Sequence, residues 1–344
     1  MPTIRSANIS VPRWASRPDV AGDRPRVLVT RTWPEAVERC LAQRFDVTLN
    51  ATDTPLDDAA LIAGMREYDA ICPTITDRMH AGILGVEGRR VAIIASYGVG
   101  FEHIDVAAAT AAGIAVTNTP GVLTDATADL ALTLILMTAR RAGEGERELR
   151  AGNWTGWRPT HLLGTSLKGK TLGLVGFGRI AQATAERARF GFGMEIAYYA
   201  RRPGPADLTD RLGARFAPDL GDLLGQSDFV SIHVPGGAET RHLIGAEAIA
   251  RMPSHAILIN TARGDVIDEA ALIAALQART IAGAGLDVFV GEPNVSPALR
   301  VLENAVLLPH LGSATRETRV AMGMRAFANL EAWFEGKAPP DRVA

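Results

Sequence analysis

The segment Thr171-Leu-Gly-Leu-Val-Gly176-Phe-Gly178-Arg-Ile-Ala181 decides the fold of this chain. It begins as a short apolar run, residues 171–175, which is typical of a buried strand. The pattern G-x-G-x-x-A follows at once and opens a helix that we expect at residues 179–190. Gly176 permits a tight turn, Gly178 lets the backbone approach a pyrophosphate, and the small Ala181 lets helix and strand pack closely. Because the N-terminus of a helix also attracts phosphate, this strand–turn–helix context predicts a dinucleotide-binding βαβ unit.

Short apolar strands alternate with helical stretches along the rest of the chain, which predicts parallel sheets covered by helices on both faces. Strands are expected at residues 26–30, 45–49, 68–72, 91–95 and 114–117 before the quoted segment, and at 195–199, 229–234, 256–260, 282–288 and 305–308 after it. A single long helix is expected at 126–150 and a closing helix at 315–335. These elements predict an α/β fold with two Rossmann-like, doubly wound parallel-sheet domains and a cleft between them.

The expected domain boundaries follow from these elements. The first series of strands is short of a complete sheet core, so we expect the closing helix to return and pack on it. This gives a discontinuous substrate-binding domain, residues 25–124 and 313–344, and a dinucleotide-binding domain, residues 125–312. Residues 1–24 are polar and contain prolines, so they have little to bury and are expected to form a flexible N-terminal extension.

Charge and composition narrow the class of protein. The 344 residues carry 36 Lys and Arg against 38 Asp and Glu, a net charge of −2 that argues against a nucleic-acid partner. No run approaches the roughly 18 apolar residues that span a bilayer, so no membrane partner is expected. Cys40 and Cys72 are too few for a disulfide framework and lack the spacing of metal ligands. We therefore expect a cytoplasmic protein without a metal site.

Three polar residues of complementary chemistry each follow a predicted strand. Arg263 follows the strand at 256–260, Glu292 the strand at 282–288, and His310 the strand at 305–308. Ligands of parallel sheets bind at the carboxyl ends of the strands, so the three residues share one position in the topology. A guanidinium can hold a carboxylate, and a histidine beside a carboxylate can donate a proton near neutral pH. Each residue alone would be an ordinary loop residue, but together, beside the dinucleotide motif, they predict a catalytic group.

A second glycine pair, Gly98-Val-Gly100, follows the predicted strand at 91–95. His103 stands where a dinucleotide fingerprint would need a third small residue, so the pair does not form such a motif. The residues alone leave two interpretations open, a glycine-rich loop end or a turn whose backbone N–H groups hold a small anion.

These motifs together resemble the D-isomer-specific 2-hydroxyacid dehydrogenase family, and within it the glyoxylate/hydroxypyruvate reductase branch. The resemblance runs from about Arg26 to the last helix, and its matching segments are residues 98–105, 119–132, 176–181, 227–240, 260–269, 285–293 and 308–315. It implies that Arg263, Glu292 and His310 are catalytic, with His310 as the proton donor. It also implies substrate binding by Arg263, by His310, and by Val99 and Gly100, whose loop matches the one that holds the substrate carboxylate. Formate dehydrogenases of the same fold pair their histidine with an amide, so Glu292 argues against formate oxidation.

The resemblance further implies a set of coenzyme contacts. They are Thr127, Gly176, Gly178, Arg179, Ile180, His233, Val234, Pro235, Thr240, Thr261, Ala262, Asp287 and Gly312.

Arg201 and Arg202 join the expected coenzyme site for a separate reason. An NAD-preferring site carries an acid at the end of its second strand, about 20 residues beyond the glycines, where it bonds the ribose hydroxyls. Here Ala200 follows the strand at 195–199, and Arg201 and Arg202 come next. Two guanidinium groups would attract the 2′-phosphate of NADP, although a solvated surface pair is the alternative. The sequence therefore predicts that NADP(H) is preferred over NAD(H).

These expectations describe an oxidoreductase, an NADPH-preferring reductase of small, unphosphorylated 2-oxo acids of the glyoxylate and hydroxypyruvate type. The alternatives are a reductase of another 2-oxo acid, such as pyruvate or phenylpyruvate, and a corepressor-like protein that binds the dinucleotide as a ligand. The segment from Trp154 to Leu163, with Trp157 and Leu162, has no obvious place in either sheet. It either folds back on its own domain or covers a second copy, and we expect a homodimer.

Overall fold

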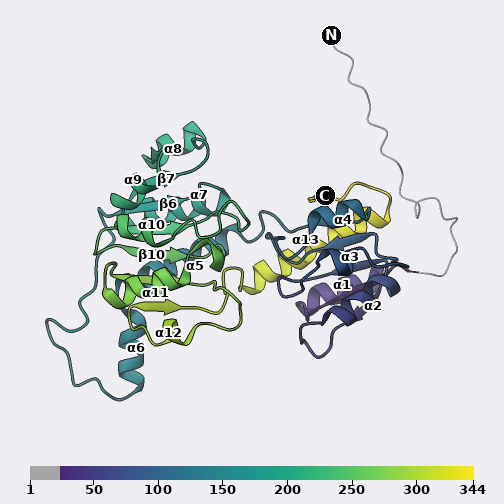
Figure 1. Ribbon diagram of the computed structural model, residues 1–344, viewed down its shortest axis with the longest axis horizontal. Helices are drawn as coiled ribbons and strands as arrows, with labels where there is room; N and C mark the ends of the chain where they lie inside the picture. The colour runs from purple at the N-terminus through teal and green to yellow at the C-terminus, as the bar shows by residue number, and fades with distance from the viewer. Residues whose placement is uncertain (1–23) are drawn as a thin grey trace, which may run out of the picture. The chain divides into compact units, whose positions relative to one another are not determined.

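The structure of the protein, a computed structural model, describes residues 24–344. The extension expected at residues 1–24 therefore lies outside the described residues, apart from Arg24. The chain forms two compact units. Of the described residues, unit 1 contains 24–122 together with Arg316–Ala344, and unit 2 contains Leu123–Thr315 (Figure 1). The described helices include none that is both long and apolar enough to cross a bilayer.

Unit 1 is built on a five-stranded sheet in the order β2-β1-β3-β4-β5, and every strand pair in it is parallel. Its strands are β1 (Arg26–Val29), β2 (Asp46–Leu49), β3 (Ala70–Cys72), β4 (Ile93–Ala95) and β5 (Ala115–Thr117). Its helices are α1 (Glu35–Arg44), α2 (Asp58–Glu67), α3 (Ala81–Leu84), α4 (Val106–Ala111) and the closing helix α13 (Arg316–Phe334). Helix α13 packs against α1 and β4, so the end of the chain completes the core of this unit.

Unit 2 is built on a seven-stranded parallel sheet in the order β12-β11-β10-β9-β6-β7-β8. Its strands are β6 (Thr171–Val175), β7 (Glu195–Tyr199), β8 (Arg215–Ala217), β9 (Phe229–Ile232), β10 (Ile257–Asn260), β11 (Gly283–Leu286) and β12 (Ala305–Leu307). Its α-helices are α5 (Thr124–Ala139), α6 (Ala142–Arg150), α7 (Arg179–Glu186), α8 (Ala206–Leu212), α9 (Leu220–Gly225), α10 (Ala246–Arg251), α11 (Glu269–Ala278) and α12 (Pro297–Arg300). Counted in chain order the strands read 3-2-1-4-5-6-7, which is the doubly wound arrangement with its switch point between β6 and β9.

Two apolar clusters cover the two faces of this sheet. One joins the sheet to α5 and α7, through residues such as Leu134, Ala181 and Ala185. The other joins it to α9, α10 and α11, through residues such as Leu224 and Leu276. The prediction of two parallel-sheet α/β domains is therefore confirmed.

The prediction of a single helix at residues 126–150 is wrong, because the segment forms two helices. The structure breaks it into α5 and α6 at Arg141, whose φ of 52° is left-handed and cannot continue a right-handed helix. The Arg141 side chain pairs with Glu144 in the first turn of α6, with Nε 3.1 Å from Oε1 and Nη2 2.6 Å from Oε2. Helix α5 buries eight of its residues, whereas α6 buries none. Helix α6 and the loop after it project from the rest of unit 2 (Figure 1).

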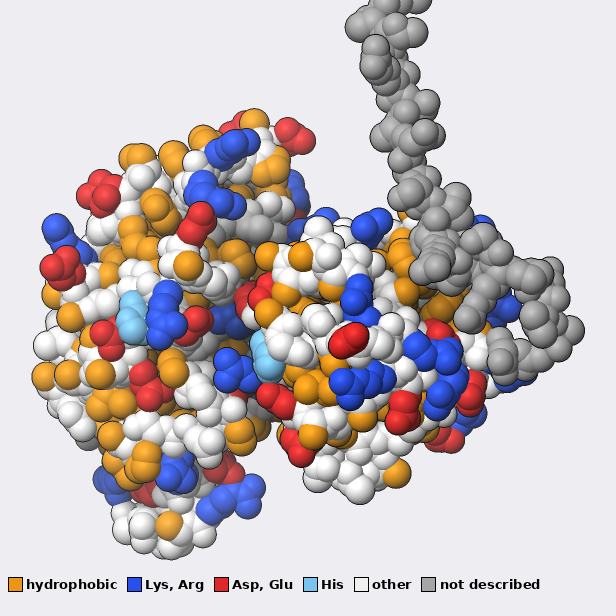
Figure 2. Space-filling view, turned by 45° about the vertical axis from the view of Figure 1, so that its right-hand side comes forward, with side chains coloured by type: hydrophobic (Ala, Val, Ile, Leu, Met, Phe, Trp, Pro, Cys, Tyr) orange, Lys and Arg blue, Asp and Glu red, His pale blue; other side chains and the backbone are white. Residues whose placement is uncertain are grey.

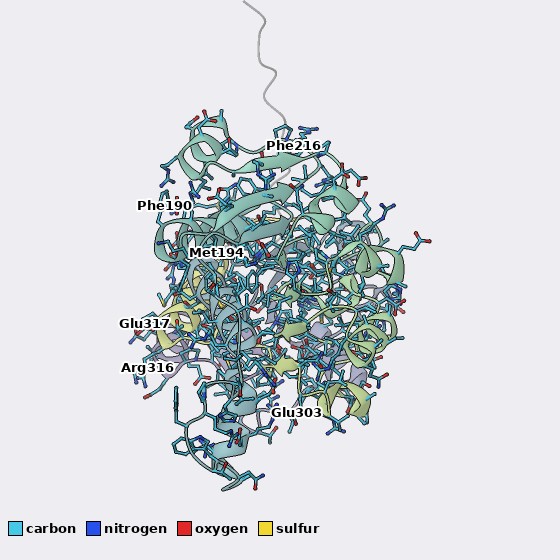
Figure 3. All side chains as sticks on the ribbon, turned by 90° about the vertical axis from the view of Figure 1, so that its left-hand side faces the viewer. Phe190, Met194, Phe216, Glu303, Arg316 and Glu317 are labelled. Atoms are coloured by element: carbon cyan, nitrogen blue, oxygen red, sulfur yellow. The ribbon has the colours of Figure 1, made fainter. Side chains whose placement is uncertain are left out.

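The sequence pattern did not predict two short elements that follow β7. Helix α8 and strand β8 follow Arg202, and β8 pairs with β7 at the edge of the sheet. Phe216 of β8 and Phe190, in the π-helical turn Arg187–Gly191 that extends α7, lie toward one end of unit 2, and Glu303 lies at the other (Figure 3). Basic and acidic side chains are interspersed over the face shown in Figure 2, in keeping with the net charge of −2.

Candidate active site

Three neighbouring strands of unit 2 carry the candidate catalytic residues. Strands β10, β11 and β12 are adjacent and parallel, and Arg263, Glu292 and His310 follow their carboxyl ends. His310 Nδ1 lies 2.8 Å from Glu292 Oε2, and the Phe289 N–H donates to Glu292 Oε1 at 2.8 Å. Both side chains of the His–Glu pair are about one-third exposed, at 30% and 31%. The pair is therefore held by hydrogen bonds yet open to a ligand.

The surroundings of Glu292 favour its charged form. Burial alone would raise the pKa of Glu292, but the hydrogen bond and positive charge of His310 outweigh it. The Phe289 N–H and the charge of Arg263 add to the same effect, so the pKa of Glu292 lies below its ordinary value. Glu292 is thus a carboxylate at neutral pH, and its Oε2 can accept a hydrogen bond from His310 Nδ1.

Asp287 fixes the turn that presents His310. The φ of His310 is 55°, a left-handed conformation that costs a residue with a side chain about 1–2 kcal/mol. The Asp287 carboxylate accepts the Leu311 and Gly312 N–H groups at 2.6 and 2.8 Å, and its carbonyl accepts the His310 N–H at 2.9 Å. Burial raises the pKa of this carboxyl despite those two amide donors. Thr127 adds a bond from its hydroxyl to the Gly312 carbonyl at 3.0 Å.

Arg263 lies in an extended segment between β10 and a short 3₁₀ turn, Gly264–Val266. Its Nη1 donates to the Ala262 carbonyl at 2.6 Å. Gly264 lies directly against the backbone of Phe289 and Val290, because a Cβ there would lie 2.1 Å from the Phe289 carbonyl carbon. The loop of Arg263 and the loop of Glu292 are therefore in van der Waals contact. Gly264 lies within the segment 260–269 that matches the family, but the sequence alone assigns it no role.

The switch point of the sheet fits a dinucleotide. Gly176 has a φ of 92°, and a Cβ there would lie 2.7 Å from the carbonyl oxygen of His233, which follows β9. Gly178 caps α7 without a side-chain hydrogen bond, and a Cβ on it would point into open space. Its neighbours Arg179 and Ile180 begin the helix, whose first N–H groups have no acceptor within the helix. A pyrophosphate would have room and donors here.

Thr261 supplies a second sign of a polar ligand. Its hydroxyl is buried, and within residues 24–344 it has no hydrogen-bond partner. It stands between Asn260 and the segment Ala262–Arg263, at the same edge of the sheet as Gly176. A buried hydroxyl without a partner is rare in folded proteins and is accounted for when a ligand completes it.

The other expected coenzyme residues lie on the loops after β7 and β9. Arg201 and Arg202 are exposed, and Arg201 Nη1 is 3.7 Å from Glu239 Oε2. Burial lowers the pKa of His233 to about 4, and its Nε2 lies 2.9 Å from the Ser231 hydroxyl. Val234, Pro235 and Thr240 continue that loop, in which the Thr240 hydroxyl donates to the Pro235 carbonyl at 2.7 Å.

Val99 and Gly100 belong to unit 1, where they follow the carboxyl end of β4. The Asn118 amide donates to the Val99 carbonyl at 2.7 Å, and the Thr119 N–H donates to the Gly98 carbonyl at 2.9 Å. These bonds use the carbonyl groups of the loop. Among the described residues the N–H groups of Val99 and Gly100 have no acceptor, which favours the anion-binding interpretation of the glycine pair over a plain loop end.

A cavity of about 370 Å³ in unit 2 lies away from these residues. It is lined by the end of α5, the start of α6 and the amino ends of β10, β11 and β12, with Arg141, Arg279 and Leu163 among its residues. Because strands run from that edge toward Arg263 and His310, the cavity and the candidate catalytic group lie at opposite edges of one sheet. This hollow is therefore not the site of the chemistry.

Comparison with known proteins agrees with this geometry. The family model described as "D-isomer specific 2-hydroxyacid dehydrogenase, NAD binding domain" matches residues 132–312. The chain is 46% identical to the glyoxylate reductase of Thermococcus litoralis over 93% of its own length and 97% of the relative's. It is also 46% identical to the glyoxylate reductase of Aeropyrum pernix, over 93% and 96%.

A solved structure is similar over nearly the whole chain. The NADPH-dependent glyoxylate/hydroxypyruvate reductase of Sinorhizobium meliloti, in complex with NADP and malonate, shares 39% identity at a TM-score of 0.83. The match covers 94% of this chain and 97% of that one. With both chains covered almost completely, the chain is a NAD(P)-dependent oxidoreductase and belongs to the D-isomer-specific 2-hydroxyacid dehydrogenase family.

Proposed function

We propose that the protein reduces small 2-oxo acids, glyoxylate and hydroxypyruvate first, with NADPH as the preferred coenzyme. The observation that carries the proposal is the 2.8 Å contact between His310, which follows β12, and Glu292, which follows β11, with Arg263 after the adjacent strand β10. The identity of 46% with two archaeal glyoxylate reductases supports the choice of substrate.

The proposed mechanism divides the reaction among three side chains. Arg263 binds the substrate carboxylate and polarises the keto oxygen. When bound, the reduced nicotinamide would supply the hydride that reduces the carbonyl carbon of the oxo acid to the alcohol. His310 bonds Glu292 through Nδ1, which leaves Nε2 to donate a proton to the oxygen as its negative charge develops. Glu292 keeps the imidazole ring oriented through the bond to Nδ1.

The same proposal assigns the coenzyme to the switch point of unit 2. The turn at Gly176 and Gly178 and the start of α7 would hold the pyrophosphate. The segments 233–235 and 261–262, with Thr127, Thr240, Asp287 and Gly312, would border the ribose and nicotinamide.

Preference for NADPH rests on Arg201 and Arg202. No carboxylate stands at the end of β7 to bond the ribose hydroxyls, because Ala200 occupies that position. The pair between Arg201 and Glu239 is 3.7 Å long with side chains 89% and 87% exposed, so it holds the guanidinium only weakly. Both guanidinium groups are thus available to a 2′-phosphate. The double variant Arg201→Ala/Arg202→Ala should raise the KM for NADPH at least tenfold while sparing NADH, and equal kcat/KM for the two coenzymes in the wild type would refute the assignment.

We also propose a homodimer. Trp154, Trp157 and Leu163, in the projecting loop after α6, are 52%, 81% and 64% exposed. Exposed aromatic side chains of this density are typical of a surface that covers a partner. Light scattering at micromolar concentration should give twice the chain mass of 36.5 kDa, and a monomer mass would contradict the proposal.

A kinetic panel tests the reaction as a whole. It comprises glyoxylate, hydroxypyruvate, pyruvate and phenylpyruvate, each with NADPH and with NADH, followed by the loss of absorbance of the reduced coenzyme. We expect the highest kcat/KM with glyoxylate or hydroxypyruvate and NADPH. Better catalysis with phenylpyruvate would overturn the substrate class, and inactivity with every oxo acid would favour a protein that only binds the dinucleotide.

A further inference from the structure

Asn260 is the last residue of β10 and is fully buried. Its backbone carbonyl accepts the Asp287 N–H at 2.9 Å, which ties the ends of β10 and β11 together. Its side-chain Oδ1 accepts the Ala262 N–H at 2.9 Å, and its Nδ2 donates to the Arg263 carbonyl at 2.8 Å. One amide therefore bonds the main chain on both sides of the 262–263 peptide.

The two bonds run in opposite directions, so they need an acceptor and a donor on one short side chain. A primary amide supplies both, whereas the carboxylate of the same shape supplies two acceptors and no donor. An aspartate at 260 would keep the bond from the Ala262 N–H. It would also place a negative oxygen against the Arg263 carbonyl, a buried repulsion that the loop can relieve only by moving.

These two hydrogen bonds of the Asn260 side chain hold the backbone of Arg263 and, through it, affect the loop of Glu292. Arg263 has extended backbone, with φ −142° and ψ 145°, and the next residue, Gly264, lies against the Phe289–Val290 backbone. The Phe289 N–H in turn holds Glu292. One side of the Arg263 loop lies against that backbone, and the Asn260 side chain bonds the loop at both Ala262 and Arg263.

We propose that Asn260 is a positioning residue for the reaction, and that its side-chain amide sets the place of the Arg263 guanidinium without touching substrate. This inference rests on the proposed function, in which Arg263 binds the substrate carboxylate. Displacement of a substrate-binding group by about 1 Å can lower a rate about 100-fold. The effect of Asn260 should therefore appear in the recognition of the oxo acid and should require Arg263.

A double-mutant cycle tests the proposal. We expect Asn260→Asp to lower kcat/KM for glyoxylate about 10- to 100-fold and to weaken binding of oxamate, an unreactive carboxylate analogue, about tenfold in the presence of coenzyme. Arg263→Ala should lower both further. In the combined variant, kcat/KM and oxamate binding should match those of Arg263→Ala within about twofold. Once the guanidinium is absent, the Asn260 side chain has no substrate-binding group to position.

A matched control separates positioning from folding. Asn304 also uses its side-chain amide on the backbone, donating to the Leu276 and Ala282 carbonyls at 3.1 and 3.4 Å, but at the opposite edge of the sheet. Asn304→Asp removes the same donor and should leave kcat/KM and oxamate binding within about twofold of the wild type. Should Asn260→Asp not fold, Asn260→Ser, which is smaller and neutral, carries the same cycle.

Two results would overturn the proposal. One is wild-type kinetics and oxamate binding in the Asn260 variants. The other is a loss that is repeated in full on the Arg263→Ala background, since additivity would make Asn260 a structural residue only. A wild-type protein inactive on every oxo acid would instead refute the proposed function. Oxamate binding by the variants would still test whether Asn260 positions Arg263.

Discussion

Replacing Glu292 by glutamine removes one charge and almost no volume, so it isolates the electrostatic part of the His–Glu pair. The Nδ1 to Oε2 distance is 2.8 Å, and both side chains are only about one-third exposed, so the dielectric constant of bulk water sets a lower limit on their attraction. Coulomb's law with that constant gives about 1.5 kcal/mol between the carboxylate and a positively charged imidazole. A free energy of that size corresponds to about a tenfold change in a rate constant.

In the glutamine variant the side-chain oxygen keeps the Phe289 N–H, so the amide nitrogen faces Nδ1 and cannot accept a hydrogen bond from it. In the reductive direction kcat/KM for glyoxylate should therefore fall at least about tenfold at neutral pH.

The assay is kcat/KM for glyoxylate with saturating NADPH, measured from pH 5 to 9. The lower end lies above the ordinary carboxyl pKa of 4.5, and the pKa of Glu292 lies below that value, so Glu292 stays a carboxylate throughout. Glu303→Gln serves as control, because Glu303 pairs with Arg147 of α6 at the other edge of the sheet. Equal kcat/KM in the wild type and Glu292→Gln would refute a charge interaction between Glu292 and His310.

Three further predictions follow from the same contacts. His310→Gln should lower turnover at least 100-fold while leaving NADPH binding within a few-fold by fluorescence titration, because it removes a proton donor rather than a coenzyme contact. Gly264→Ala would force the Phe289 backbone to move and should lower stability by about 1–3 kcal/mol in urea unfolding, whereas Gly191→Ala, whose Cβ meets nothing within 4 Å, should not. The pKa of His233 is lowered to about 4, so between pH 6.5 and 5 the unfolded chain binds a proton that the folded chain does not. Over that range the wild type should lose up to about 1.5 kcal/mol more stability than His233→Asn, and equal losses would contradict the shift.

Much of the sheet architecture was predictable, because its cause is local. Apolar runs such as 171–175 and 257–260 leave little choice but buried parallel strands, and the residues that follow them must meet at one edge. That reasoning brought Arg263, Glu292 and His310 to neighbouring strands. It could not show that His310 turns its Nδ1 to Glu292, because side-chain direction depends on the left-handed turn that Asp287 holds.

The errors have equally physical causes. The break at Arg141 escaped because the sequence there contains no proline, and a single left-handed residue leaves no trace in the apolar pattern. Strand β8 has three residues, too few for any periodicity, and it exists because β7 offers an unpaired edge. The role of Asn260 was hidden because an asparagine at a strand end is common, and only its two bonds reveal what it holds.

The division of the chain into two units bears on how an enzyme of this kind could acquire a different substrate specificity. The three residues proposed for catalysis, Arg263, Glu292 and His310, follow adjacent strands of one sheet in unit 2. A side-chain hydrogen bond joins His310 to Glu292, and a close backbone contact at Gly264 joins the loops of Arg263 and Glu292. The loop of Val99 and Gly100 belongs to a unit with its own sheet and its own core. Mutations that reshape the loops of unit 1 can therefore accumulate without disturbing the catalytic contacts inside unit 2. Selection for activity on a new oxo acid could therefore change unit 1 while the residues proposed for catalysis in unit 2 stay the same.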